Sequence, residues 1–198
     1  MPPSSPTRTL AHEDRLKWNA RYRESSLIAP PQRPACHPLA LRWKSRFVGG
    51  PMLDAACGLG RGVACGIDRF APIYAVDVSD VAIVTARNLW PQSNIRWIIG
   101  DVTALPWEEE AFGLICSFRF TDRAFMKRML TYVRPGGMIL FEGFSERQLE
   151  TKPDRNPAWT MTRSGLAELF ASWEVLEIGE SSAPHFLVHC AAIRPKRT

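Results

Sequence analysis

The chain has 198 residues, of which 45% are hydrophobic and 23% are charged, and its formal net charge is +5. This length supports one substantial core and excludes two ordinary domains with separate cores. No run of about 18 apolar residues is present and the first residues lack the apolar core of a secretory signal, so neither a membrane span nor export is expected and a cytoplasmic location is the default.

The basic residues are dispersed, and no recognition motif accompanies them, which argues against a nucleic-acid partner. The five cysteines are scattered and include no C-x-x-C pair. They are expected to be reduced and mostly buried, so neither a disulfide framework nor a metal site is predicted.

The N-terminal region precedes the main domain. Residues 1–10 are rich in proline, serine and threonine and are expected to form a disordered tail. An amphipathic helix is predicted over about 12–24, with Trp18 and Tyr22 on one face. The proline-rich stretch 26–38 then predicts an extended strap. Residues 11–50 are thus expected to be a helix and strap that cover the cofactor of a domain spanning 51–198.

From residue 51 onward, short apolar runs alternate with helical patterns. This alternation predicts right-handed crossovers and an α/β, Rossmann-like, doubly wound sheet between two helical layers. Ser79 is predicted to cap a helix over about 79–90. The last two apolar runs are joined by only four residues and must form an antiparallel hairpin, so the sheet is expected to be mostly parallel with an antiparallel last strand. Strands are predicted at 51–57, 72–78, 95–101, 112–118, 137–144, 174–180 and 185–193, and further helices at 121–133 and 164–173.

The stretch "LDAACGLGRG" at 53–62 follows the first strand with three glycines. Glycines in this place let the backbone turn sharply and lie against a ligand, although a plain tight turn also uses them. A dinucleotide fingerprint needs a third glycine at position 63, which is valine here. The spacing therefore disfavours a nicotinamide dehydrogenase.

Acidic residues follow three strands in succession: Asp54, Asp77 and Asp101. Ligands of open α/β sheets bind at the carboxyl ends of the strands, and the distance in sequence from Asp54 to Asp77 suits an acid that holds a ribose. A row of acids repels phosphates. It suits a ligand with a cationic head, a ribose diol and an adenine amine.

These motifs resemble those of the class I S-adenosylmethionine-dependent methyltransferases. "LDAACGLG" is similar to their first motif, with Ala56 where many members have glycine, and "AVDVS", "GDVTALPW", "FGLICSFRF" and "VRPGGMILFEGF" are similar to the later ones. Three shorter stretches, "KWNARY", "RFTDR" and "NPAWTMTRSGLAELF", resemble the small bacterial tellurite-resistance-type methyltransferases.

The resemblance implies S-adenosylmethionine as cofactor. It places Asp77 on the ribose, Asp101 and Val102 on the adenine, and Arg23 or Arg61 on the methionine carboxylate. Asp54 orients the loop and the ammonium, or else is only a structural cap. The cofactor-binding residues expected from the resemblance are Trp18, Arg23, Asp54, Ala56, Cys57, Gly58, Gly60, Arg61, Asp77, Val78, Asp101, Val102, Ser117 and Phe118.

In-line methyl transfer needs no dedicated base, because positioning and exclusion of water supply most of the rate. Candidate bases are Tyr22, His185 and Glu142, although Tyr22 can simply belong to the buried helix face, His185 can simply cap the last hairpin and Glu142 can pair with a surface arginine. Arg119 and Arg123 are expected to contact an anionic substrate, or else to form structural salt bridges.

The "SFRF" after the fourth strand differs from the motif of enzymes that methylate exocyclic amines of nucleic acids, so a small-molecule acceptor is favoured. Residues 145–161 are expected to fold over the site together with the N-terminal helix. A protein that binds S-adenosylmethionine without turnover, as a partner or regulatory subunit, is the alternative. Neither the acceptor nor the oligomeric state can be derived from the sequence.

Overall fold

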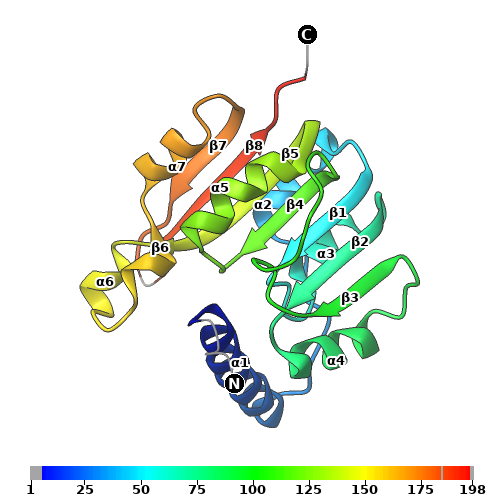
Figure 1. Cartoon of the computed structure of the whole chain (residues 1–198), viewed down its shortest axis with the longest axis vertical. Coiled ribbons are helices and arrows are strands. Elements are labelled where there is room, and N and C mark those ends of the chain that lie inside the picture. Colours follow the sequence, from blue (N-terminus) through cyan, green and yellow to red (C-terminus); the bar gives the residue numbers. More distant parts are fainter. Residues whose placement is uncertain (1–5, 184, 197–198) are drawn as a thin grey trace.

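The computed structural model describes residues 6–183 and 185–196, with the side chains of residues 6–11 left out. In this part of the chain one sheet runs in the order β3-β2-β1-β4-β5-β8-β7, and the two-residue β6 pairs with the end of β5 (Figure 1). The strands are β1 (Gly50–Ala55), β2 (Phe70–Asp77), β3 (Ile95–Ile99), β4 (Phe112–Phe118), β5 (Val133–Ser145), β6 (Thr160–Met161), β7 (Glu174–Glu180) and β8 (Leu187–Ile193).

The pairings from β3 through β5 are parallel, and β8 is antiparallel to both β5 and β7. The prediction of a mostly parallel sheet with an antiparallel last strand is therefore confirmed. From the sequence, β5 is expected to start near residue 137, but it starts at Val133, directly after α5.

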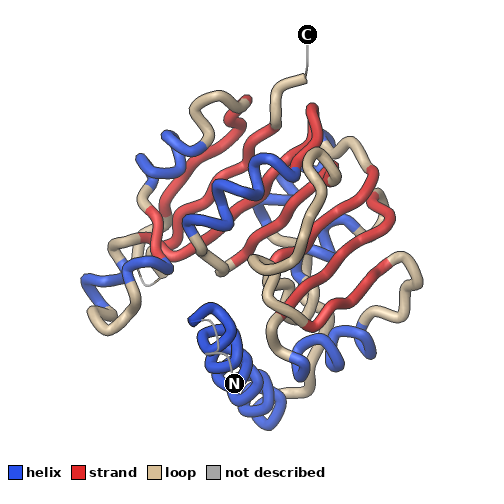
Figure 2. Tube along the Cα trace, viewed as in Figure 1, coloured by secondary structure: helices blue, strands red, loops and turns tan. Residues whose placement is uncertain are grey.

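Helices cover both faces of the sheet (Figure 2). One face packs against α2, α3 and α4, and the other against α5 and α7. Side chains alternate between the two cores along a strand: Met52 packs on the first face and Leu53 on the second. The helices are α1 (Pro6–Ile28), α2 (Pro38–Trp43), α3 (Arg61–Gly66), α4 (Asp80–Leu89), α5 (Arg123–Tyr132), α6 (Gln148–Thr151) and α7 (Arg163–Leu169), with short 3-10 turns at Lys44–Arg46 and Pro157–Trp159.

Local sequence explains where these helices begin. Ser79 caps α4 as predicted, because its hydroxyl accepts a hydrogen bond from the Ala82 amide at 3.1 Å. Asp122 caps α5 in the same way, with the Phe125 amide at 2.7 Å. The apolar stripe of α5 then points into the second core, where Phe125, Met126 and Met129 are buried.

The N-terminal helix is longer than the sequence indicated. α1 begins at Pro6, so residues 6–10, which were expected in a disordered tail, are helical, while residues 1–5 lie outside the described residues. Proline is well tolerated in the first turn of a helix, which permits this earlier start. α1 ends at Ile28, just before the prolines of the strap. No helix in the described ranges is long and apolar enough to cross a bilayer.

Candidate active site

The glycine loop after β1 turns through left-handed backbone. Ala56, Gly58 and Gly60 have φ of 53°, 52° and 91°. Below the loop, the buried Asp54 carboxylate accepts a hydrogen bond from the Val63 amide at 2.9 Å. A Cβ on Gly62 would lie 2.3 Å from an oxygen of this carboxylate, so that position is restricted to glycine. Asp54 therefore acts as a cap between the loop and α3, and burial raises its pKa to about 8.

Asp77 joins the ends of β1 and β2. Its two carboxylate oxygens accept hydrogen bonds from the Gly58 amide and the Ser79 amide, both at 2.8 Å. The residue is 7% exposed, and burial raises the pKa of its carboxyl while the two amides partly offset this effect. Each carboxylate oxygen can accept a second hydrogen bond, which is the capacity that a vicinal diol requires.

Asp101 and Val102 follow β3 at the same edge of the sheet. The Asp101 carboxylate accepts hydrogen bonds from the Thr103 amide at 2.8 Å and the Thr103 hydroxyl at 2.7 Å. The buried Val102 accepts a bond on its carbonyl from the Trp107 indole at 3.3 Å. Asp101 thus stabilises the turn that follows β3. Val78, directly after β2, is half-buried.

Helix α1 lies across the carboxyl ends of the first strands (Figure 1). The buried Asn19 attaches it to α4: its side-chain oxygen accepts a hydrogen bond from the Ser79 hydroxyl at 2.7 Å, and its amide donates to Asp80. A Cβ on Gly58 would lie 2.4 Å from the Tyr22 hydroxyl, so Tyr22 sits directly on the loop. Burial, and the nearby Asp77 after it, raise the pKa of Tyr22.

Two residues of α1, Trp18 and Arg23, were predicted to bind the cofactor. Trp18 is half-buried beside Tyr22, with 6.4 Å between ring centroids, and the Arg21 guanidinium lies over it. Arg23 is exposed. The helix therefore presents Asn19 and Tyr22 to the site.

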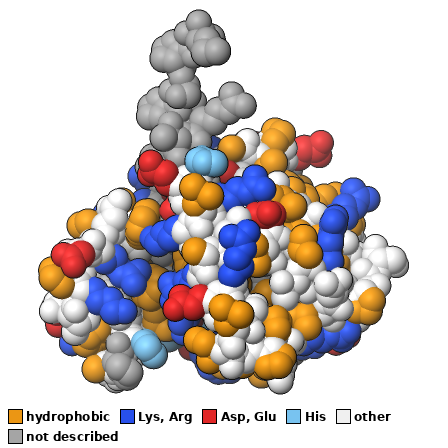
Figure 3. All heavy atoms as spheres, turned by 90° about the horizontal axis from the view of Figure 1, so that it is seen from below, with side chains coloured by type: hydrophobic (Ala, Val, Ile, Leu, Met, Phe, Trp, Pro, Cys, Tyr) orange, Lys and Arg blue, Asp and Glu red, His pale blue; other side chains and the backbone are white. Residues whose placement is uncertain are grey.

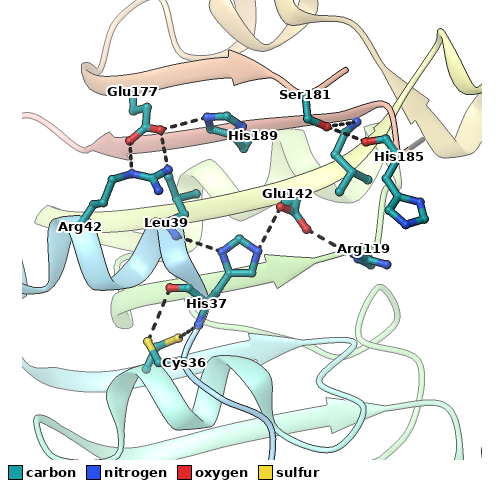
Figure 4. A network of polar contacts seen from close by, with 12 residues as sticks. Cys36, His37, Leu39, Arg42, Arg119, Glu142, Glu177, Ser181, His185 and His189 are labelled. Carbon is teal, nitrogen blue, oxygen red and sulfur yellow. Dashed lines mark hydrogen bonds and ion pairs between the residues drawn. The ribbon is translucent and has the colours of Figure 1, made fainter. Parts of the chain in front are cut away.

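The end of β4 meets the strap at a histidine that the sequence analysis did not single out. The His37 ring stacks on Phe118 with 4.1 Å between centroids and 10° between planes. Its Nδ1 accepts a hydrogen bond from the Leu39 amide at 3.2 Å, so the proton is on Nε2, which lies 3.1 Å from Glu142 Oε2 (Figure 4). The neighbouring Ser117 hydroxyl donates to the Phe120 carbonyl at 3.1 Å.

Glu142 lies at the centre of this cluster. Its second oxygen, Oε1, is 3.7 Å from the Arg119 Nε. Burial raises the pKa of this carboxyl, but the His37 hydrogen bond and the charges of Arg119 and Arg61 outweigh that effect and lower the pKa overall. Glu142 is therefore an ionised carboxylate that is 86% shielded from solvent, since its side chain is 14% exposed.

A cavity of about 340 Å³ opens beside this carboxylate. It lies between the strap and the ends of β4, β5 and β8. Its size is in the range of sites for small ligands. The residues that line it are His37, Pro38, Leu39, Arg42, Arg61, Arg119, Glu142 and His189.

Other predicted residues lie outside this cavity. Arg123 pairs with Glu146 at 2.6 Å and donates to the Thr160 carbonyl, so it has the structural role that was its alternative. The His185 side chain is exposed, and its carbonyl accepts a hydrogen bond from the Ser181 hydroxyl in the last hairpin. Cys57 is buried inside the glycine loop, where its amide donates to the Val76 carbonyl at 2.9 Å.

Two residues of the site, Asn19 and His37, were missed. His37 had a local signal, because a polar residue followed by proline at the first helical position predicts a helix start. Asn19 lies one position after Trp18 on the predicted buried face, but nothing in the sequence indicates its partner, which is 60 residues away.

Comparison with known proteins identifies the domain. Residues 52–137 match the family model described as a methyltransferase domain. Among curated proteins, none is significantly similar in sequence. One similar solved structure is the 1,6-didemethyltoxoflavin-N1-methyltransferase from Burkholderia thailandensis with bound 1,6-didemethyltoxoflavin and S-adenosylhomocysteine. It is 16% identical over 99% of this chain and 93% of that chain, with a TM-score of 0.65.

Two further solved structures share the fold. The N-methyltransferase NodS from Bradyrhizobium japonicum is 17% identical over 79% of this chain and 93% of its own, with a TM-score of 0.62. A protein from a study of the conversion of a disulfide bond into a thioacetal group in echinomycin biosynthesis is 20% identical over 93% of both chains, with a TM-score of 0.66. The family match over residues 52–137 and the strand order show a methyltransferase domain with the Rossmann-like fold of class I methyltransferases.

Proposed function

We propose that the protein transfers the methyl group of S-adenosylmethionine to a small-molecule acceptor that binds in the cavity beside Glu142. One observation carries this proposal. The Asp77 carboxylate accepts a hydrogen bond from the Gly58 amide at the carboxyl end of the parallel strands, and the cavity that contains Glu142 lies at the same end of the sheet.

The cofactor side of the site is assigned to the loop and the acids that follow the strands. Asp77 holds the ribose hydroxyls, and Asp101 with Val102 holds the adenine. Arg61, the first residue of α3, holds the methionine carboxylate, since it lines the cavity whereas Arg23 is exposed on α1. Bound S-adenosylmethionine supplies a methyl group on a positively charged sulfur.

Glu142 is the proton acceptor in this proposal. A lone pair of the methyl acceptor forms the new bond to the methyl carbon, and sulfur keeps the electron pair of the sulfur–carbon bond that breaks. The proton that the methyl acceptor loses passes to Glu142. A carboxylate with a lowered pKa is a weak base, so it takes this proton only as the new bond makes the acceptor acidic. His37 is a positioning residue, because its Nε2 proton fixes the Glu142 carboxylate.

Two segments would cover the site. α1 rests on the glycine loop through Tyr22, and the 145–161 segment approaches α1 through Trp159, whose ring lies 4.9 Å from the Lys17 ammonium. Closure of both segments would exclude water from the reacting atoms, which favours methyl transfer over side reactions.

The solved structures support a small acceptor, because one of those proteins is described with bound 1,6-didemethyltoxoflavin. The tellurite-resistance-type subfamily is a finer proposal and rests only on the three short sequence stretches. The alternative without turnover is less well supported, because a protein that only binds cofactor needs no open cavity beside an ionised carboxylate.

Calorimetry and a transfer assay test the proposal. Purified protein is titrated with S-adenosylhomocysteine and, separately, with NAD. It is then incubated with methyl-labelled S-adenosylmethionine and a metabolite extract. We expect binding of S-adenosylhomocysteine alone and a labelled small product. Binding of NAD instead would refute the proposal, and cofactor binding without any labelled product would support the alternative.

A further inference from the structure

Positively charged side chains outnumber negatively charged ones around the cavity. It contains three arginines and one carboxylate, Glu142. Arg42 is already neutralised by Glu177, which accepts from it at 2.6 and 3.0 Å and whose pKa is lowered to about 2, chiefly by that arginine. Arg61 makes no side-chain hydrogen bond or ion pair with the residues that the structure describes, and Arg119 stays 3.7 Å from Glu142. Two guanidinium groups therefore face one carboxylate.

Arg119 is held at the cavity by its backbone. Its φ is 64°, in the left-handed region that non-glycine residues rarely adopt, and its amide donates to the Glu142 carbonyl at 2.6 Å. This conformation has an energetic cost, and such costs are concentrated at functional sites. The side chain is half-exposed, so its remaining N–H groups are free to bind a ligand.

The approach to the site is also basic. Lys and Arg side chains gather on the face where α1 and the 145–161 segment lie (Figure 3). Arg155 stacks over Phe144, near the end of β5, with 3.8 Å from the guanidinium carbon to the ring centroid. Its Nε is buried and has no hydrogen-bond partner among the residues that the structure describes, and burial and the nearby Arg21 lower the pKa of Arg155. A surface of this kind attracts anions from solution.

We propose that the methyl acceptor is a small organic acid whose carboxylate is bound by Arg119 and whose nucleophilic N–H or O–H faces Glu142. This inference rests on the proposed function and names its substrate class. Arg119 is the guanidinium that remains for the acceptor once Arg61 holds the methionine carboxylate. A planar guanidinium binds a carboxylate through two parallel hydrogen bonds, which fixes the orientation of the acceptor.

Matched pairs of acids and amides test the inference. The probes are 2-aminobenzoate against 2-aminobenzamide, 4-hydroxybenzoate against 4-hydroxybenzamide, and glycine against glycinamide. Each is titrated by calorimetry into protein saturated with S-adenosylhomocysteine, and its methylation is measured separately. We expect at least one acid to bind about 10-fold more tightly than its amide, because only the acid forms a charge-assisted pair with Arg119.

The variants Arg119→Gln and Arg119→Asn should abolish this preference, because the acid and the amide then meet the same neutral side chain. Asparagine tolerates left-handed backbone, so Arg119→Asn removes the charge without added strain. Arg87→Gln, an exposed arginine in the last turn of α4, is the matched control and should keep the preference.

Equal binding of acids and amides, binding of no acid, or an unchanged preference in both Arg119 variants would overturn the inference. The proposed function fails separately, in the same calorimeter, if the protein does not bind S-adenosylhomocysteine.

Discussion

The imidazole of His37 stacks on the ring of Phe118 at 4.1 Å and holds the Glu142 carboxylate through Nε2 at 3.1 Å. A residue of the proline-rich strap is thereby fixed to the ends of two central strands. Its Nδ1 also caps α2 through the Leu39 amide. His37 therefore links the position of the strap to the ionisation of Glu142.

Replacement of His37 should change the pH dependence of the reaction. His37→Asn keeps an N-cap for α2 but removes the hydrogen bond that lowers the pKa of Glu142, so that pKa rises. In the proposed mechanism the ionised form of Glu142 accepts the proton, so the acidic limb of the kcat profile should move to higher pH. His37→Ala should shift the same limb and also lower the free energy of unfolding by about 1–3 kcal/mol. An unchanged limb in both variants would contradict the positioning role.

Asp77→Asn should weaken cofactor binding strongly. The amide keeps one acceptor oxygen but loses the charge and the second acceptor, which costs about 1.5–3 kcal/mol for each charge-assisted hydrogen bond. Calorimetry with S-adenosylhomocysteine should show at least about a 10-fold weaker affinity. Asp68→Asn, on an exposed aspartate that pairs with Lys44, is the control and should bind like the wild type. Equal affinity of both variants would remove Asp77 from the ribose site.

The buried Asp54 makes stability depend on pH. Its pKa of about 8 in the folded protein is above the ordinary aspartate value of 3.8, so between these pH values the folded state binds more protons than the unfolded state. The contribution of Asp54 is therefore fully present below about pH 4 and is lost as pH rises toward 8. Denaturant unfolding is measured for wild type and Asp54→Asn across this range. The free energy of unfolding of the wild type minus that of Asp54→Asn should decrease as pH increases. A difference that stays constant would disprove the raised pKa.

Gly62→Ala should destabilise the protein through one contact. The new Cβ would lie 2.3 Å from Asp54 Oδ1 and would displace the carboxylate that caps the loop. Overpacking of this kind costs about 1–3 kcal/mol in free energy of unfolding. Gly100→Ala is the matched control, because a Cβ there meets nothing within 4 Å. If chemical denaturation gave the two variants equal stabilities, the close packing of Gly62 on Asp54 would be wrong.

Asn19→Ala should loosen α1 without affecting the sheet. It removes the hydrogen bonds that join the helix to Ser79 and Asp80. Hydrogen exchange should become faster in α1 and stay unchanged in β1 and β4, and S-adenosylhomocysteine should dissociate faster. Glu24→Ala, on an exposed position of the same helix, is the control. Unchanged exchange in α1 would show that other contacts hold the helix.

Most of the fold could be predicted because its signals are local. The alternation of apolar runs and helical patterns gave the parallel sheet, and the short link before β8 gave the antiparallel hairpin. The Ser79 cap was also readable, since a capping serine acts on its own helix. The start of α1 was missed, because proline and threonine in its first turn have the composition of a disordered tail.

The site was harder to predict because it depends on contacts between distant segments. Asp77 lies where a parallel sheet must place it, next to the glycine loop. By contrast, His37 reaches Glu142 only because the strap folds back over the end of β5, and no periodicity encodes that path. Arg119 and Arg123 have the same sequence signal, yet Arg119 lines the cavity and Arg123 pairs with Glu146.

The place of β8 in the sheet has a consequence for biosynthesis. β8 lies between β5 and β7, so β7 can join the sheet only after a strand that follows it in the chain. During translation, the strands that position Asp54 and Asp77 leave the ribosome long before β8. His189, which lines the cavity beside Glu142, belongs to β8 and is made after every other strand of the sheet. The side of the site that holds Asp54 and Asp77 can therefore form early, while the cavity must wait until β8 has been made.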